Sequence, residues 1–197
     1  MSCKGFSSRF DEALVYASDL HRDQARKGNG FPYVSHLLSV TGIVIENGGD
    51  EDTAIAALLH DSVEDQGGEA TLNQIRQRWG DCVAGIVREC SDNEGEPKRP
   101  WAERKRDFVA TIPRLTPGAR LVALADKLHN IRCVVADYRQ HGDSVWSRFN
   151  GGRDGTLWYY QAAVAAFREA GNEPLLQELS ETVDQLISTA GERDGQA

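Results

Sequence analysis

The sequence predicts an all-α fold, a single bundle of helices, and three observations support this class. Apolar residues recur at helical spacing along nearly the whole chain. The alternation of apolar and polar residues that marks a half-buried strand is absent. With 197 residues, 40% of them hydrophobic, the chain has the length and apolar content of one packed domain.

The apolar stripes divide the chain into consecutive helices. The ranges over which helical spacing holds are 10–21, 34–44, 50–63, 71–79, 81–90, 101–112, 117–138, 157–167 and 174–186. The stretches SDNEGEPKRP (91–100) and HGDSVWSRFNGGRDG (141–155) are polar and rich in helix breakers, which favours loops. We expect one domain over residues 1–190 and a flexible C-terminal tail over 191–197.

Helix boundaries are indicated by residues that cap helices or end them. Polar side chains that accept a hydrogen bond from a first-turn N–H stand before several stripes. These are Ser7 or Ser8, Asp50 or Asp52, and Thr71 of the capping-box sequence TLNQ. Glycines, which adopt the left-handed conformation that ends a helix, follow other stripes. These are Gly48-Gly49, Gly67-Gly68 and Gly80.

Charge and composition exclude several classes of partner. The net charge is −8 and the isoelectric point about 5.1, and a nucleic-acid backbone requires clustered cations instead. No apolar run reaches the roughly 18 residues of a membrane span, and MSCKGFSSRFDEA carries no secretory signal. The four cysteines form no CxxC pair, which is typical of reduced thiols. We expect a cytoplasmic protein that binds neither nucleic-acid polymers nor membranes.

Ionisable residues stand out within one apolar stripe. His60 and Asp61 follow two leucines, a costly position for charged groups that have no partners. Glu64 and Asp65 come one helical turn later, so in a continuous helix His60 and Glu64 share a face, as do Asp61 and Asp65. An imidazole and three carboxylates this close would repel one another without a cation. The segment therefore predicts a cation site.

Two other apolar segments carry similar residues. His36 lies in the stripe 34–44, and Asp126 lies in LVALADKLHN. Histidine nitrogens and carboxylate oxygens, without thiolates, suit a first-row divalent ion better than calcium. Taken singly, each residue has a simpler interpretation: His36 as a satisfied core or surface histidine, and Asp126 as an ion-pair partner of Lys127 or Arg132. Helical spacing alone leaves both interpretations open.

Together with the residues around them, these segments resemble the HD-domain hydrolases of the RelA/SpoT type, especially the stand-alone alarmone hydrolases. HRDQARKGNGFPYVSHLLSV is similar to that family's HxGQxRKxGxPYxxHPxxV, and AALLHDSVED to the stretch that contains HDxxED. LADKLHN is similar to its LADxLHN. The motifs occur in the family's order, and the match runs from about residue 21 to residue 160. The resemblance implies an all-α HD-domain bundle.

The resemblance also implies roles for particular residues. The implied ligands of one divalent ion, expected to be Mn²⁺, are His36, His60, Asp61 and Asp126. Glu64 and Asp65 match the acidic pair proposed for acid/base catalysis and water orientation. The implied substrate-binding residues are Arg26 and Lys27 at a nucleotide base, Asn130, and Tyr159, where the register is open by one residue.

The implied activity is hydrolysis of the 3′-pyrophosphate of guanosine 3′,5′-bis(diphosphate), ppGpp, which yields GDP and pyrophosphate. Two other enzymes fit the same fold, a phosphatase of NADPH or another phosphorylated nucleotide and a nucleotidase of ordinary monophosphates. A non-catalytic nucleotide sensor is the alternative of another class, and it predicts loss of a ligand or of the acidic pair. Asp23, Leu37 and the 90–98 and 141–160 segments depart from the family pattern, so the exact substrate stays open.

Overall fold

The computed structural model describes residues 5–27, 30–91, 99–170 and 174–194, and it confirms the all-α class. The helices in chain order are α1 (Ser8–Leu20), α2 (Val34–Glu46), α3 (Glu51–Leu59), α4 (Ser62–Asp65), α5 (Gly68–Cys90), α6 (Trp101–Thr111), α7 (Pro117–His141), α8 (Gly152–Ala170) and α9 (Pro174–Asp194). Two 3₁₀ helices, η1 (Ile112–Arg114) and η2 (Gly142–Arg148), lie between them. Within the described ranges, β-type pairing is limited to an isolated bridge between Ala25 and Pro32.

The chain forms two compact units where one domain was predicted over residues 1–190. The first unit combines Leu115–Ala123 with the chain up to Lys98, and the second combines Arg99–Arg114 with Leu124–Ala197. Helix α7 contributes its first turns to the first unit and its remainder to the second. No helix in the described part of the chain is long and apolar enough to cross a membrane.

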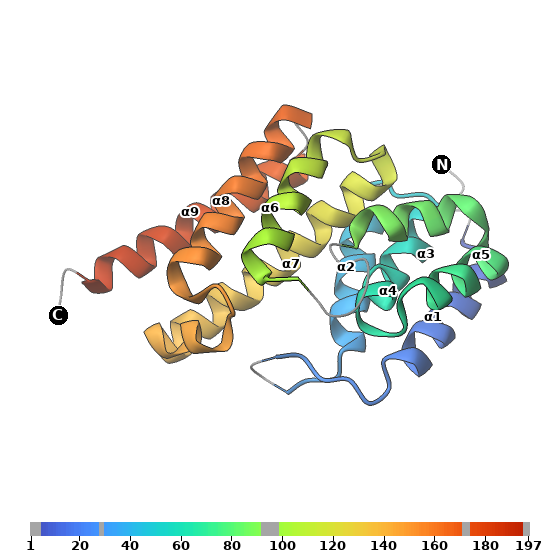
Figure 1. Ribbon diagram of the computed structural model, residues 1–197, viewed down its shortest axis with the longest axis horizontal. Helices are drawn as coiled ribbons and strands as arrows, with labels where there is room; N and C mark the ends of the chain where they lie inside the picture. The colour runs from blue at the N-terminus through green and yellow to red at the C-terminus, as the bar shows by residue number, and fades with distance from the viewer. Residues whose placement is uncertain (1–4, 28–29, 92–98, 171–173, 195–197) are drawn as a thin grey trace. The chain divides into compact units, whose positions relative to one another are not determined.

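Helix α3 forms the centre of the first unit. Every residue from Thr53 to Leu59 is buried, and the helix packs against α1, α2 and α5 (Figure 1). Three alanines in this stretch present no long side chain, so neighbouring helices can approach closely on more than one side. A helix that is apolar all round belongs in a core, and the residues that follow α3 are therefore delivered into the interior.

The predicted caps are present at the first two boundaries. Ser7 Oγ accepts a hydrogen bond from Arg9 N at 3.3 Å, which identifies Ser7 as the N-cap of α1. Asp50 accepts one from Thr53 N at 2.9 Å and so caps α3. Between α2 and α3, Gly48 has a φ of +83°, a conformation that favours glycine. These boundaries are confirmed, and each follows from local hydrogen bonding.

The capping box at Thr71 is a wrong prediction. Helix α5 begins at Gly68, after Gly67 with a φ of +115°, so Thr71 already lies within the helix. Its hydroxyl donates to the carbonyl of Gln66 at 2.6 Å instead of capping. The predicted break at Gly80 is confirmed, because its φ of +93° interrupts the helical backbone of α5.

The continuous helix predicted across His60 is also wrong. Helix α3 ends at Leu59 and the short α4 begins at Ser62, so the His60-Asp61 pair lies in the turn between them. His60 Nδ1 donates to the carbonyl of Ala57 at 2.8 Å. In an uninterrupted helix that carbonyl would accept from the backbone N–H of Asp61. A side chain thus takes the place of a backbone donor where α3 ends.

In the second unit, α8 packs against α6, α9 and both 3₁₀ helices. The stretch predicted as a loop over 141–155 is more ordered than expected, since η2 occupies residues 142–148 and α8 begins at Gly152. Tyr138 Oη and Trp146 Nε1 both donate to Asp143 Oδ1, at 2.9 and 3.1 Å, and hold this 3₁₀ turn against α7. Helix α9 continues to Asp194, four residues into the range predicted as a tail.

Candidate active site

His36, His60 and Asp61 meet at one point of the first unit. Asp61 Oδ2 lies 3.3 Å from His36 Nε2 and 3.1 Å from His60 Nε2. The two imidazole rings are 5.2 Å apart and inclined at 62°. His36 comes from the first turn of α2, whereas the other two come from the turn between α3 and α4. The structure therefore brings together three of the four predicted ligands within this unit.

Hydrogen bonding determines which nitrogen of His60 faces the cluster. The carbonyl of Ala57 can only accept, so His60 Nδ1, 2.8 Å away, carries the proton. In the neutral ring, Nε2 then presents its lone pair toward Asp61. A backbone carbonyl that binds the far nitrogen is the usual way to orient a metal-ligating histidine.

The spacing and chemistry of the three donors fit a divalent ion. Bonds of about 2.1 Å at right angles place two ligand atoms about 3.0 Å apart, and tetrahedral bonds place them about 3.4 Å apart. The two distances from Asp61 Oδ2 to the imidazole nitrogens fall in this range. A nitrogen lone pair that faces a carboxylate oxygen so closely is repulsive unless a cation lies between them. The set is therefore suited to holding one.

Charge and hydrogen bonds both act on Asp61, whose side chain is 21% exposed. Burial alone would raise the pKa of this carboxyl, but His60 and His36, in their protonated forms, add positive charge and hydrogen-bond donors that outweigh burial and hold the pKa well below its usual range. Tyr33 Oη also donates to Asp61 Oδ2 at 2.6 Å. Asp61 is thus an ionised acceptor at the centre of the cluster.

Tyr33 is a site residue that the sequence reasoning missed. It precedes His36 by one helical turn, and its ring packs edge-on against the His36 ring at 5.6 Å. The buried His21 lies nearly parallel to the Tyr33 ring, with ring centroids 5.2 Å apart and planes inclined at only 15°. The sequence did offer a signal for this role, because PYVSH places an aromatic residue with a hydroxyl group one turn before a candidate ligand.

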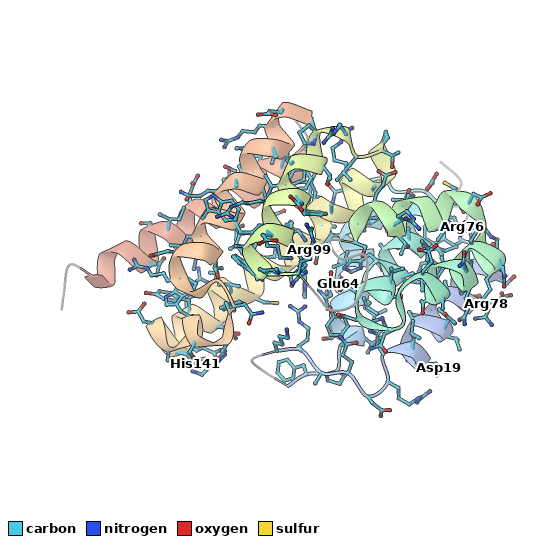
Figure 2. The ribbon with its side chains drawn as sticks, viewed as in Figure 1. Asp19, Glu64, Arg76, Arg78, Arg99 and His141 are labelled. Atoms are coloured by element: carbon cyan, nitrogen blue, oxygen red, sulfur yellow. The ribbon has the colours of Figure 1, made fainter. Side chains whose placement is uncertain are left out.

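The acidic pair lies on α4, where Figure 2 labels Glu64. Although α3 and α4 are separate, Asp65 N donates to the carbonyl of Asp61 at 3.0 Å, so one helical turn still connects them. Asp65 Oδ2 accepts a hydrogen bond from Gln24 Nε2 at 2.8 Å. The pair therefore stays beside the cluster. It is positioned by the turn between α3 and α4 and not by the continuous helix that was predicted.

Arg26 and Lys27 lie where the chain folds back before α2. Arg26 N donates to the carbonyl of Phe31 at 2.8 Å, and Tyr33 N donates to that of Gln24 at 3.0 Å. The Arg26 guanidinium is 5.9 Å from the centroid of the Tyr33 ring. Since Tyr33 also binds Asp61, it connects Arg26 to the cluster. Lys27 is exposed, and Gly28 and Asn29 of the connecting loop lie outside the described residues.

Asp126 lies in the second unit, on α7, and is buried as expected. Asn130 Nδ2 donates to its Oδ1 at 2.5 Å, and Lys127 Nζ approaches its Oδ2. The expected ion pair with Lys127 is therefore present, whereas Arg132 pairs with Glu178. Asn130 and Lys127 lie on the same helix as Asp126, so these contacts are local.

A cavity of about 180 Å³ in the second unit contains two predicted substrate residues, Asn130 and Tyr159. Tyr160 also lines it, so the register stays open by one residue. The remaining wall includes Trp101 and two lysines that the sequence reasoning did not assign. Lys105 Nζ lies 5.1 Å from the centroid of the Tyr159 ring, and Lys127 Nζ lies 4.9 Å from that of Phe108. Flat rings and cations together suit a flat, phosphorylated ligand.

A larger hollow of about 840 Å³ between α1 and α5 contains none of the predicted site residues. Three carboxylates, from Asp11, Glu12 and Asp19, line it together with a single arginine, Arg78. This excess of negative charge opposes a phosphorylated ligand. The chemistry of the lining therefore favours the smaller cavity as the substrate pocket.

Comparison with known proteins is consistent with this arrangement. The model of the family described as HD domain matches residues 13–157. Guanosine-3′,5′-bis(diphosphate) 3′-pyrophosphohydrolase MESH1 of Mus musculus is 35% identical over 183 residues, covering 91% of this chain and 93% of the relative. The Homo sapiens protein of the same name is 39% identical over 137 residues, covering 66% and 74%.

A solved structure is similar over nearly the whole chain. It carries the description "A metazoan ortholog of SpoT hydrolyzes ppGpp and plays a role in starvation responses". The TM-score is 0.75 at 31% sequence identity, and the alignment covers 93% of this chain and 98% of that one. Fold and sequence therefore point to the same group of hydrolases.

Proposed function

The chain belongs to the HD domain family, and from this premise we propose that it hydrolyses ppGpp at the 3′-pyrophosphate and releases GDP and pyrophosphate. The guanosine pentaphosphate would yield GTP in the same way. The enzyme is an HD-domain phosphohydrolase, as its relatives are. The observation that carries the proposal is the meeting of His36 and His60 at Asp61 Oδ2.

We propose that His36, His60, Asp61 and Asp126 hold one divalent ion. In the described part of the chain, His36, His60 and Asp126 are buried and each offers one ligand atom. Two imidazoles and two carboxylates form a set that suits Mn²⁺ and its first-row neighbours. The proposed ion is Mn²⁺. When bound, such an ion supplies a water of lowered pKa and neutralises charge on phosphoryl oxygens.

The protein's own groups then divide the remaining work. Glu64 and Asp65 accept the proton of the attacking water and return one to the departing oxygen. Tyr33 keeps Asp61 in place through its 2.6 Å hydrogen bond. The Ala57 carbonyl keeps His60 in the tautomer that presents Nε2.

Substrate charge and shape are proposed to be matched by a second group of side chains. Arg26 and Lys27 bind the nucleotide base, because a guanidinium can stack on any flat ring, whatever its substituents. Asn130 and Tyr159 contact the ribose or phosphates, and the cavity that they line adds Lys105 and Lys127 as phosphate-binding cations. The ligand is a small phosphorylated nucleotide, and the cytoplasmic location stays a prediction.

A substrate panel tests the proposal directly. The purified chain is stripped with a chelator, reloaded with Mn²⁺, Zn²⁺ or Mg²⁺, and supplied with ppGpp, NADPH or GMP. We expect pyrophosphate and GDP from ppGpp in a Mn²⁺-dependent reaction, at a rate of about 1–10³ s⁻¹, which is usual for enzymes. Product identity is read by chromatography, so that release of pyrophosphate is distinguished from release of phosphate.

The other outcomes each select another function. Cleavage of NADPH but not of ppGpp would identify a nucleotide phosphatase on the same ligand set. Release of phosphate from GMP alone would identify an ordinary nucleotidase. Binding of ppGpp without turnover under every metal would contradict an enzyme and identify a nucleotide sensor.

A further inference from the structure

We propose that Gln24 is a positioning residue for Asp65, and that His21 sets the direction in which the Gln24 amide points. The inference rests on the proposed function, because it concerns the acidic pair of that reaction. Neither Gln24 nor His21 is among the predicted ligands, and both follow α1 in the chain. The role proposed for them is to hold an exposed carboxylate beside the reacting atoms.

A short chain of hydrogen bonds links the three residues. Gln24 Nε2 donates to Asp65 Oδ2 at 2.8 Å, and Gln24 Oε1 lies 2.7 Å from His21 Nδ1. Gln66 Nε2 donates to the same Gln24 oxygen at 2.6 Å. His21 Nε2 lies 3.4 Å from the hydroxyl of the buried Ser62. The network therefore joins the end of α1 to both ends of α4.

The proton positions in this network follow from one another. An ionised carboxylate can only accept, so the NH₂ group of Gln24 must face Asp65 and its oxygen must face His21. Because that oxygen can only accept, His21 Nδ1 must carry the proton. His21 Nε2 is then an acceptor for the Ser62 hydroxyl. Reversing the Gln24 amide would oppose two acceptors at Asp65 and two donors at Gln66, and both contacts would become repulsive.

Burial fixes the position of the His21 ring at one end of the network. The ring is 2% exposed, and it lies nearly parallel to the ring of Tyr33, which itself binds Asp61. Asp65, in contrast, is exposed, so its carboxylate would sample several rotamers without an anchor. Through its two hydrogen bonds, Gln24 therefore links the fixed His21 ring to the Asp65 carboxylate and restricts the rotamers of a side chain that must contact water and substrate.

Kinetic variants test whether Gln24 acts through Asp65. We expect Gln24→Ala to lower kcat by about tenfold, as for other residues that orient an active group, with little change in KM or metal content. Gln24→Glu keeps the size of the side chain but removes the donor, so the loss should be larger. Gln77→Ala is the matched control, because this exposed glutamine on α5 takes no part in the network, and its kcat should stay within about twofold.

A double-mutant cycle separates positioning from a general structural effect. In an Asp65→Asn background, Gln24→Ala should produce no further loss, because its target has already been changed. A further tenfold loss in that background, or unchanged activity in both Gln24 variants, would overturn the inference. Thermal unfolding of each variant shows whether a fall in activity merely follows a fall in stability.

A second measurement does not depend on activity. With ¹⁵N-labelled histidine, His21 should show the Nδ1–H tautomer in the wild-type protein, and Gln24→Ala should shift it toward Nε2–H. An Nε2–H tautomer in the wild type would overturn the inference whatever the kinetics show. If the substrate panel shows no hydrolysis while His21 is in the Nδ1–H form, the proposed function fails and the hydrogen-bond network stands.

Discussion

The predicted metal cluster of the first unit and the cavity of the second are built from different kinds of contact. In the cluster, nitrogen and oxygen atoms approach to between 2.6 and 3.3 Å, and every partner is held by a further hydrogen bond or ring. In the cavity, lysine ammonium groups lie about 5 Å from ring centroids. The cluster fixes the positions of individual donor atoms, whereas the cavity selects only for the charge and flatness of a ligand.

This difference has a consequence for function. A cluster that orients donor atoms determines whether the reaction occurs, because ligand geometry tolerates little displacement. A pocket of aromatic walls and long cationic side chains determines how tightly a class of ligand binds, because such side chains can adjust. We therefore expect changes in the cluster to affect kcat and changes in the cavity to affect KM.

The largest effect is expected for Asp61→Asn. The variant loses the negative charge of the carboxylate that lies between the two imidazoles. Metal content at equal Mn²⁺ should therefore fall, and hydrolysis should drop by about a thousandfold or more. Metal analysis and initial rates measure both quantities. Asp19→Asn on α1 is the control, since this exposed carboxylate pairs with Arg22, which follows the helix. Full activity in Asp61→Asn would contradict the ligand assignment.

A smaller effect is expected for Glu64→Gln. Loss of an acid/base group should lower kcat by about a hundredfold while metal content and thermal stability stay close to wild type. Glu69→Gln, an exposed change nearby on α5, serves as the control. If Glu64→Gln and Asp65→Asn both retained full activity, the acidic pair would be an ordinary solvated helix end.

The smallest effect is expected in the cavity, for Lys105→Met. Removing a cation from the wall should raise KM for ppGpp by about five- to tenfold with kcat nearly unchanged, and the difference should shrink at high salt. The adjacent Arg106→Met is the matched control, because Arg106 lies over Trp158 and does not line the cavity. A fall in kcat with constant KM would show that the two regions do not divide their roles in this way.

The helices themselves could be predicted because they depend on local properties. Apolar spacing located the helices around His36 and Asp126, and the caps at Ser7 and Asp50 follow from side chains within three residues of the N–H groups that they bind. The 3₁₀ helix η2 escaped prediction because Gly, Asp and Ser are typical of loops. Its order depends on two aromatic residues that bind Asp143.

The sequence by itself determined the inventory of the candidate site: two histidines and two aspartates in apolar surroundings, an acidic pair one turn later, and a basic pair before them. Only the tertiary structure decided the pairings. Tyr33 reaches Asp61 across 28 positions of the chain, and Gln24 reaches Asp65 across 41. Such partners share no local periodicity, because the fold brings the segment between α1 and α2 against the turn after α3 and against α4. The end of α3 has the same cause, since the competition between the His60 ring and a backbone N–H is resolved only once the ring is buried.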